Sequence, residues 1–166
     1  MGVNSLGHYK RWPIDCFAEV ARWLIEQHHA QILIYCGPGE EEYNRSLKPL
    51  LPGTLQTSVF DRIQTRSVRE LAGLIAHCQL FVGNDTGPRH IAQALDIPLL
   101  TIVSPLGHSA IANPVSHPRY RFIDTNHQHP EQEVLAVQHQ LSMLWDQVTL
   151  PHGKPEEPTP DPIPVR

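Results

Sequence analysis

The sequence predicts a three-layer α/β protein, in which a parallel sheet carries helices on both faces. Two observations lead to this prediction. Short, nearly continuous apolar segments alternate along the chain with segments whose apolar residues recur at helical spacing. Glycine-rich turns follow two of the apolar segments, as is typical of strand ends. Repeated strand–helix units favour a parallel sheet, because parallel neighbours need a crossover connection.

The N-terminal part predicts a helix followed by a buried strand. Proline is tolerated in the first turn of a helix, so Trp12-Pro13 is expected to open one. Residues 31–36 form a short apolar run that is typical of a strand buried on both faces. Residues 2–5 look like the end of a strand whose beginning is absent, so we expect the chain to be a piece of something larger. The helix has one apolar face, made by Phe17, Val20, Ala21, Leu24, Ile25 and His28.

Two more helices and a weak strand are expected next. Gly37-Pro38-Gly39 ends the buried strand, and the acidic residues 40–42 favour a helix start through the helix dipole. A weak strand is expected near residues 59–63. Ser67-Val-Arg-Glu70 is a capping-box pattern placed just before apolar residues at helical spacing, and it predicts a helix that runs to about His77.

The remaining elements follow the same alternation. A strand over residues 80–82 ends in a tight turn, residues 83–87, which leads into a helix over residues 90–95. A further strand is expected over residues 99–103. After a proline-containing loop, the last expected elements are a strand over residues 120–123 and a helix over residues 131–145, and the loop itself spans residues 104–119.

Residues 1–147 are therefore expected to form one Rossmann-like domain. Residues 148–166 are rich in proline and nearly free of apolar residues, so they are expected to be a disordered tail. Neither segment contains an apolar run of the roughly 20 residues that would span a bilayer.

Composition limits the classes of function. The formal net charge is -4, which argues against nucleic acid as a partner, because phosphate contacts need an excess of lysine and arginine. The three cysteines lack CxxC spacing and are typical of small buried side chains in a reducing compartment, so we expect a cytoplasmic protein. The eleven histidines lack the spacing of known zinc sites, and neither a metal nor a cofactor is expected. No Walker loop, GxGxxG or GxSxG motif occurs.

The turn after the strand at residues 80–82 is the strongest candidate site. Backbone N–H groups at a helix start bind anions, Gly87 allows close approach, and Thr86 adds a hydroxyl. The carboxylate of Asp85 accepts hydrogen bonds from sugar hydroxyls. His90, one turn into the helix, is placed to face the same ligand or to pack. An equally consistent interpretation is that Asp85 caps the helix and Gly87 supplies the turn geometry.

Two other strand-end segments are candidates. A glutamate after Gly37 could take ribose hydroxyls, as an acid near a strand end does in dinucleotide-binding folds, although this segment taken alone is better explained by complementing the helix dipole. Lys10 could pair with a phosphate as a mobile point charge, or could be a solvated surface lysine beside a buried tryptophan.

Taken together, these segments resemble glycosyltransferase family 9, the ADP-heptose:lipopolysaccharide heptosyltransferases. The resemblance covers about residues 1–145, and its most specific element is Asp-Thr-Gly-Pro-x-His-Ile-Ala after an apolar strand. The resemblance implies the GT-B fold, two Rossmann-like domains facing across a cleft, of which this chain matches only the C-terminal, donor-binding one. The matching segments, in family order, are Lys10-Arg-Trp-Pro13, Gly37-Pro-Gly-Glu-Glu41, Ser67-Val-Arg-Glu-Leu71, Phe81-Val-Gly-Asn-Asp-Thr-Gly-Pro88 and His90-Ile-Ala92.

The family also implies roles for these residues. Lys10 would contact the donor phosphates, and Asp85 would bind the transferred sugar. A glutamate would hold the ribose; Glu41 fits the G-x-x-x-E spacing, and Glu40 is the near alternative. Residues that would hold the diphosphate or lie beside it are Thr86, Gly87 and His90. The resemblance assigns no catalytic residue to this chain.

The expected ligand is an ADP-sugar, although ADP rather than UDP or GDP rests on the family alone. The general base and the acceptor site belong to the family's N-terminal domain, and so does any contact with the inner membrane. The chain is therefore expected to bind the donor without transferring it, and to self-associate weakly through its uncovered cleft face. The alternative is a non-catalytic partner or fold relic of the same family. Departures from the family pattern are Arg89, Asp96 and Ser104-Pro105, and the first could add a phosphate contact or alter donor choice.

Overall fold

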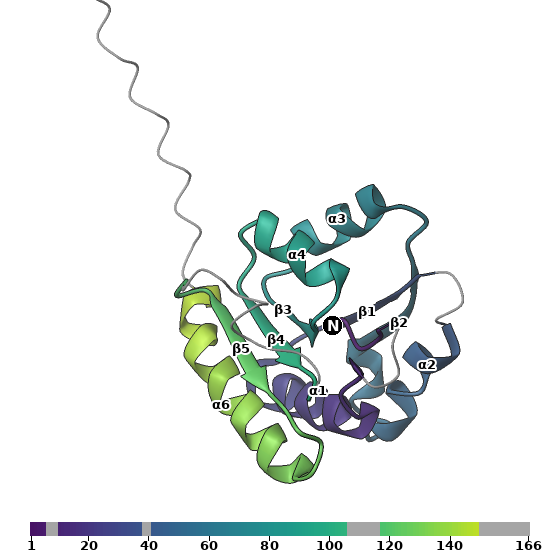
Figure 1. Ribbon diagram of the computed structural model, residues 1–166. Helices are drawn as coiled ribbons and strands as arrows, with labels where there is room; N and C mark the ends of the chain where they lie inside the picture. The colour runs from purple at the N-terminus through teal and green to yellow at the C-terminus, as the bar shows by residue number, and fades with distance from the viewer. Residues whose placement is uncertain (6–9, 38–40, 106–116, 150–166) are drawn as a thin grey trace, which may run out of the picture.

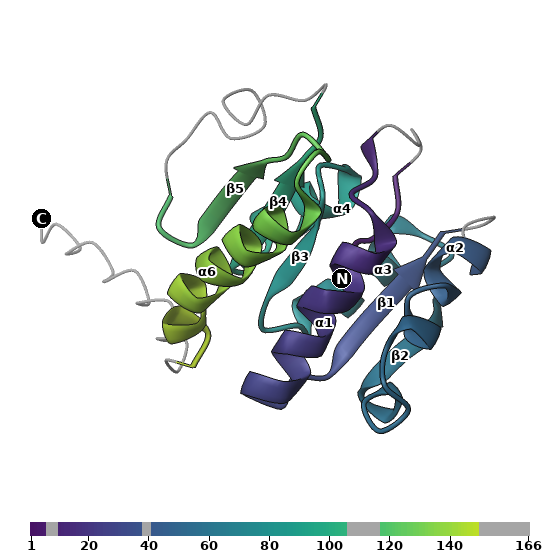
Figure 2. The same ribbon diagram turned by 90° about the horizontal axis from the view of Figure 1, so that it is seen from below.

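The computed structural model describes residues 1–5, 10–37, 41–105 and 117–149. As predicted, parallel strands form the middle layer of a three-layer α/β fold (Figure 1). Helices α1 and α6 cover one face and lie next to each other in the second view (Figure 2), while α3 and α4 cover the opposite face. The helices are α1 (Ile14–His28), α2 (Glu41–Arg45), α3 (Val68–Ala76), α4 (Gly87–Ala94) and α6 (Pro130–Thr149), with short 3-10 helices η2 (Lys48–Leu50) and η3 (Gln56–Ser58).

The strands form two parallel sheets. One pairs β1 (Ile32–Cys36) with β2 (Val59–Gln64). The other has the order β3 (Phe81–Asn84), β4 (Leu99–Val103) and β5 (Tyr120–Asp124). All these strands run in the same direction within their sheets, so their carboxyl ends share an edge, which is where ligands bind in open α/β sheets.

The first residues of the chain lie between the two sheets. The Gly2 amide donates to the Val82 carbonyl (2.8 Å), and the Asn84 amide donates to the Gly2 carbonyl (3.0 Å). On the other side, the Met1 amine donates to the Leu33 carbonyl. An isolated parallel bridge pairs Gly2 with Gly83, so this segment takes part in the pairing of β3. The N-terminus accordingly lies between β1 and β3 in Figure 1.

Apolar side chains pack on both faces of the strands. The β4 strand contributes to both clusters, because successive strand residues point to opposite faces. The cluster under α1 and α6 includes Phe17, Val20, Leu24, Leu100, Ile102, Val137, Leu141 and Leu144. The cluster under α3 and α4 includes Ile75, Phe81, Ala92, Ile97 and Leu99.

The predicted capping box at the start of α3 is present in a modified form. The Glu70 amide donates to the Ser67 hydroxyl (3.1 Å), as the pattern predicts. The Glu70 carboxylate accepts from the Arg66 amide (2.8 Å), one residue before the usual partner. Of the apolar residues expected on this helix, Ile75 is buried, whereas Val68 is 72% exposed because it lies in the first turn on the solvent side.

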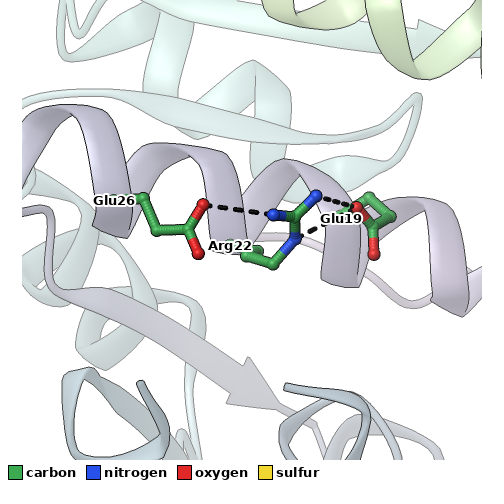
Figure 3. A network of polar contacts seen from close by, with 3 residues as sticks. All are labelled: Glu19, Arg22 and Glu26. Atoms are coloured by element: carbon green, nitrogen blue, oxygen red, sulfur yellow. Dashed lines mark hydrogen bonds and ion pairs between the residues drawn. The ribbon is translucent and has the colours of Figure 1, made fainter. Parts of the chain in front are cut away.

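The outer face of α1 carries a chain of charges. Arg22 pairs with Glu19 at 2.6 Å and with Glu26 at 3.2 Å, one turn to either side (Figure 3). The side chains of all three are exposed, and such helical pairs stabilise by only about 0.3–0.5 kcal/mol each. This network therefore adds only modestly to the stability of α1.

Some element boundaries differ from the predictions. The β3 strand continues through Asn84, and α4 begins at Gly87, whereas the sequence predicted a turn there and a helix only from residue 90. The last helix extends to Thr149, beyond the predicted domain boundary at residue 147. Most of the predicted loop over residues 104–119 and nearly all of the predicted tail lie outside the described residues.

Asp96 has a positive φ of 53°, in the left-handed region that glycine adopts most easily. Here the aspartate side chain accepts from the Tyr120 hydroxyl (3.0 Å) and pairs with Arg119. The turn before β4 is thus compatible with a non-glycine residue because its side chain is anchored to β5.

The cysteines are free thiols; Cys16 and Cys36 are buried as expected, whereas Cys78 is only partly buried. Burial raises the pKa of Cys16 to about 12, so this residue packs in the core as an uncharged thiol. Within the described part of the chain, no helix has the length and apolar character that crossing a membrane requires.

Candidate functional site

The β3–α4 turn forms the centre of the candidate site. The strand ends at Asn84, and the Asp85 amide then donates to the Ile102 carbonyl of β4 (3.1 Å). This bond ties the turn to the neighbouring strand, so the residues that follow start at a defined place on the carboxyl edge. Thr86 and Gly87 begin α4 from that point, and His90 lies exposed one turn further on.

The start of α4 is open to a ligand. Its N-cap residue is Thr86, whose side chain makes no capping hydrogen bond and donates only a long one (3.4 Å) to the Asn84 carbonyl. The Gly87 amide has no partner among the described residues, and Pro88 has no amide hydrogen to offer. An unpaired amide at the positive end of a helix dipole attracts an anion.

Gly87 faces open space. A Cβ atom added there would have no heavy atom within 4 Å, and the φ angle of Gly87 lies outside the positive range that requires glycine. The interpretation that Gly87 supplies turn geometry is therefore not supported. The absence of a side chain instead leaves room for a ligand to approach the backbone, as at phosphate-binding helix starts.

Asp85 does not cap the helix. Its Oδ1 atom accepts from Nε of Arg89 at 2.8 Å, and its side chain remains 32% exposed. The capping interpretation of Asp85 is thus wrong, because its carboxylate turns to a side chain rather than to backbone amides. The carboxylate therefore stays partly exposed just before the open helix start, where it can accept a ligand hydroxyl.

The segment that carries Lys10 is fastened to the end of β3. The Trp12 amide donates to Oδ1 of the fully buried Asn84 (3.0 Å), and Asn84 Nδ2 donates to the Val3 carbonyl (2.8 Å). Lys10 itself is exposed two residues before this anchor. The structure therefore brings an exposed lysine to the same edge as the β3–α4 turn, as the predicted phosphate contact requires.

A buried glutamate completes this anchor. Glu133 of α6 accepts from the Trp12 indole N–H through Oε2 (2.8 Å) and from the amides of Asn126 and His127 through Oε1 (2.9 and 2.8 Å). It thereby joins the Lys10 segment to the turn after β5. Glu133 was not predicted, because nothing in the sequence distinguishes it from the other acidic residue in the first turn of α6, Glu131.

Glu41 lies at the carboxyl edge on the other sheet. It is the first residue of α2, and its Oε1 accepts from Nε2 of Gln64 at the end of β2 (3.2 Å). No hydrogen bond or ion pair joins it to the β3–α4 turn in the described part of the structure. Glu40, the alternative ribose ligand, lies outside the described residues.

A cavity of about 400 Å³ lies at the opposite, amino-terminal ends of β1 and β3. Its lining includes Met1, His28, His77 and Trp145 and none of the predicted donor residues. Burial and the neighbouring His29 lower the pKa of His28 there. We place the candidate site at the carboxyl edge, because that edge holds the open helix start and the exposed carboxylate. Across the described residues, no group of three or more potential metal ligands comes together.

The chain is similar to known glycosyltransferases. Residues 4–150 match the sequence profile of "Glycosyltransferase family 9 (heptosyltransferase)". Lipooligosaccharide heptosyltransferase 2 of Haemophilus influenzae is 31% identical over 101 residues, which are 61% of this chain and 29% of that protein. Lipopolysaccharide heptosyltransferase 2 of Salmonella typhimurium is 30% identical over 113 residues, 68% of this chain and 32% of that protein. The chain thus spans about a third of the length of these relatives.

Solved structures share the fold. The E. coli ADP-heptose lps heptosyltransferase II superposes with a TM-score of 0.67 at 24% identity, over 86% of this chain and 44% of that one. The E. coli heptosyltransferase WaaC with ADP superposes with a TM-score of 0.68 at 22% identity, over 85% of this chain and 42% of that one. Both neighbours have the GT-B fold, and this chain corresponds to less than half of each.

Proposed function

The chain belongs to glycosyltransferase family 9, and from that premise we propose that it is the donor-binding part of an inverting transferase. The donor is a nucleotide-sugar of the ADP-heptose type, and the product serves lipopolysaccharide or another glycan. The observation that carries this proposal is the open, uncapped start of α4 beside the exposed carboxylate of Asp85. A diphosphate and a polyol are the two chemical groups that such a pair recognises.

The names of relatives support the choice of donor. The curated relatives are heptosyltransferases, and neighbouring structures are described with ADP and with ADP-2-deoxy-2-fluoro heptose. In this chain we assign the diphosphate to Thr86, Gly87 and Lys10, and the transferred sugar to Asp85. His90, exposed on α4, lies beside the ligand, and Glu41 holds the ribose.

These residues serve the departure of the nucleotide. As the glycosidic bond to the diphosphate breaks, negative charge grows on the leaving phosphate oxygens. A preorganised amide at Gly87, the Thr86 hydroxyl and the Lys10 ammonium stabilise that charge without a metal ion. Anchoring of the Lys10 segment by Asn84 and Glu133 keeps the lysine near the turn before the donor arrives.

The acceptor hydroxyl needs a general base to remove its proton. We assign that base to the N-terminal, acceptor-binding half of the GT-B architecture. This chain by itself is accordingly expected to bind the donor and not to transfer the sugar.

Replacing Gly87 by alanine tests the diphosphate site. The new methyl group meets no protein atom within 4 Å, so the free energy of unfolding should stay the same or rise by up to about 1 kcal/mol. The same methyl group occupies the space through which a phosphate reaches the Gly87 amide. We expect the Kd for ADP, measured by isothermal titration calorimetry, to rise about tenfold, which corresponds to about 1.4 kcal/mol.

Gly73→Ala is the matched control. Gly73 is a helical glycine on α3 with equally open surroundings, and it lies outside the proposed site. It should gain stability and leave the Kd for ADP unchanged. If Gly87→Ala binds ADP as tightly as the unmodified protein, the diphosphate does not lie at the start of α4.

A further inference from the structure

Arg89 departs from the family pattern, and the structure shows which groups its guanidinium contacts. The side chain is only 3% exposed. Its Nε donates to Asp85 Oδ1 (2.8 Å), one NH₂ group donates to Gln93 Oε1 (3.1 Å), and its guanidinium lies over the Phe122 ring at 5.5 Å. These contacts hold the guanidinium under the helix start, so Arg89 is not available as the phosphate contact that the sequence left open.

The contact with Arg89 occupies one of the two carboxylate oxygens of Asp85. One carboxylate oxygen, Oδ1, is held by a buried and rigidly packed guanidinium. The other oxygen, Oδ2, has no hydrogen-bond partner among the described residues. A planar guanidinium that is itself fixed by Gln93 and Phe122 permits few orientations of the carboxylate. The free oxygen is therefore presented in one direction before any ligand binds.

We propose that Arg89 is a positioning residue that aims the free oxygen of Asp85 at one hydroxyl of the donor's sugar, and so sets which sugars the site accepts. This inference rests on the proposed donor-binding function. A fixed acceptor rejects a sugar whose hydroxyl lies elsewhere, because the carboxylate is tied to a buried guanidinium and does not turn to follow that hydroxyl. Arg89 is buried against Asp85, Gln93 and Phe122, so we expect it to act on the sugar through Asp85 and not on the nucleotide or the phosphates.

A purely structural role has a different signature. An i,i+4 ion pair that only stabilised α4 would change the free energy of unfolding and affect all ligands alike. A positioning role changes the ratio of two affinities, one for ADP and one for ADP-heptose. The quantity to measure is therefore the sugar advantage, defined as the Kd for ADP divided by the Kd for ADP-heptose.

The experiment measures both Kd values by calorimetry, without acceptor, for the unmodified chain and for Arg89→Met, Arg89→Lys and Asp85→Asn. We expect Arg89→Met to keep the Kd for ADP within twofold and to lower the sugar advantage about tenfold. Arg89→Lys keeps the charge but loses the planar contact, so it should lower the sugar advantage by less than Arg89→Met does. Asp85→Asn should lower the sugar advantage at least as much as Arg89→Met, and combining the two should add little, because both act through one carboxylate.

Each outcome decides something. An unchanged sugar advantage in Arg89→Met and Arg89→Lys overturns the inference and leaves the donor site standing. ADP binding without any sugar advantage in the unmodified chain also overturns it, while the nucleotide part of the proposed function survives. No binding of ADP by the unmodified chain overturns both. If thermal unfolding shows that Arg89→Met does not fold, the sugar advantages of Arg89→Lys and Asp85→Asn test the inference in its place.

Discussion

Gly83→Ala is expected to destabilise the protein by about 3 kcal/mol, because the added methyl group meets backbone atoms. A Cβ atom at this position would lie 2.6 Å from the Gly2 carbonyl oxygen and 2.9 Å from the Gly2 Cα. These are backbone atoms, so no side-chain rotation relieves the clash. Either the first residues leave their place between the sheets, or β3 moves away from them. Urea unfolding followed by circular dichroism measures the loss.

Two further glycines provide the comparison for Gly83. A Cβ atom at Gly2 would meet the ends of two side chains, Phe81 and Tyr35, both at 2.9 Å, and these can shift. Gly2→Ala should therefore cost clearly less than Gly83→Ala. Gly53→Ala, which meets nothing within 4 Å, should be neutral. A Gly83→Ala protein as stable as the unmodified one would show that residues 1–2 do not join the two sheets.

Asn84→Leu is the second variant with a large expected effect, and it should lower both the stability of the protein and its affinity for ADP. Leucine has a similar shape but cannot hydrogen-bond, so the Trp12 amide and the Val3 carbonyl lose their partner. A buried polar group without a partner costs about 1–3 kcal/mol, so we expect a total loss of about 3 kcal/mol. The Lys10 segment also loses its anchor to β3. The Kd for ADP should consequently rise about fivefold in the protein that remains folded.

A core variant separates the two effects. Leu144 is fully buried in α6 and touches no predicted donor residue, and Leu144→Ala should cost about 2–5 kcal/mol. Calorimetry at a temperature where both variants are folded should show normal ADP affinity for Leu144→Ala and weakened affinity for Asn84→Leu. Equal ADP affinities in the two variants would mean that the anchor at Asn84 does not place Lys10 for the ligand.

Local sequence patterns predicted most of the architecture. The β4 strand was predicted with its observed bounds, because a run of apolar residues between two prolines has few other solutions. The α1 helix was predicted by its proline start and its apolar spacing. Where the local sequence pattern and the environment in the fold favour the same structure in this way, the sequence alone predicts the element.

The boundary between β3 and α4 shows where local patterns fail. Gly83 and Asn84 look like turn residues, yet both lie in the strand. Gly83 is needed there because Gly2 passes close to it, and Asn84 because it bonds two distant backbone groups. These reasons depend on segments about 80 residues away, which no local window contains.

The candidate site was predicted only in part, because some of its contacts also join segments that lie far apart in the sequence. The four predicted donor residues between Asp85 and His90 were proposed from their order after a strand. The bond from Trp12 to Glu133 joins residues 121 positions apart, and it leaves no sequence signal. The contact of Arg89 with Asp85 did leave one, since a carboxylate just before a helix start attracts a cation in the first turn of that helix.

The most direct test of the account is a titration of the unmodified chain with ADP, UDP and GDP, followed by the amide signals in NMR spectra. The account predicts that ADP shifts the amides of Asp85, Thr86 and Gly87 and those near Glu41, and that the residues around the cavity at His28 do not respond. A shift confined to the cavity residues, or no shift at millimolar ADP, would contradict a donor site at the start of α4.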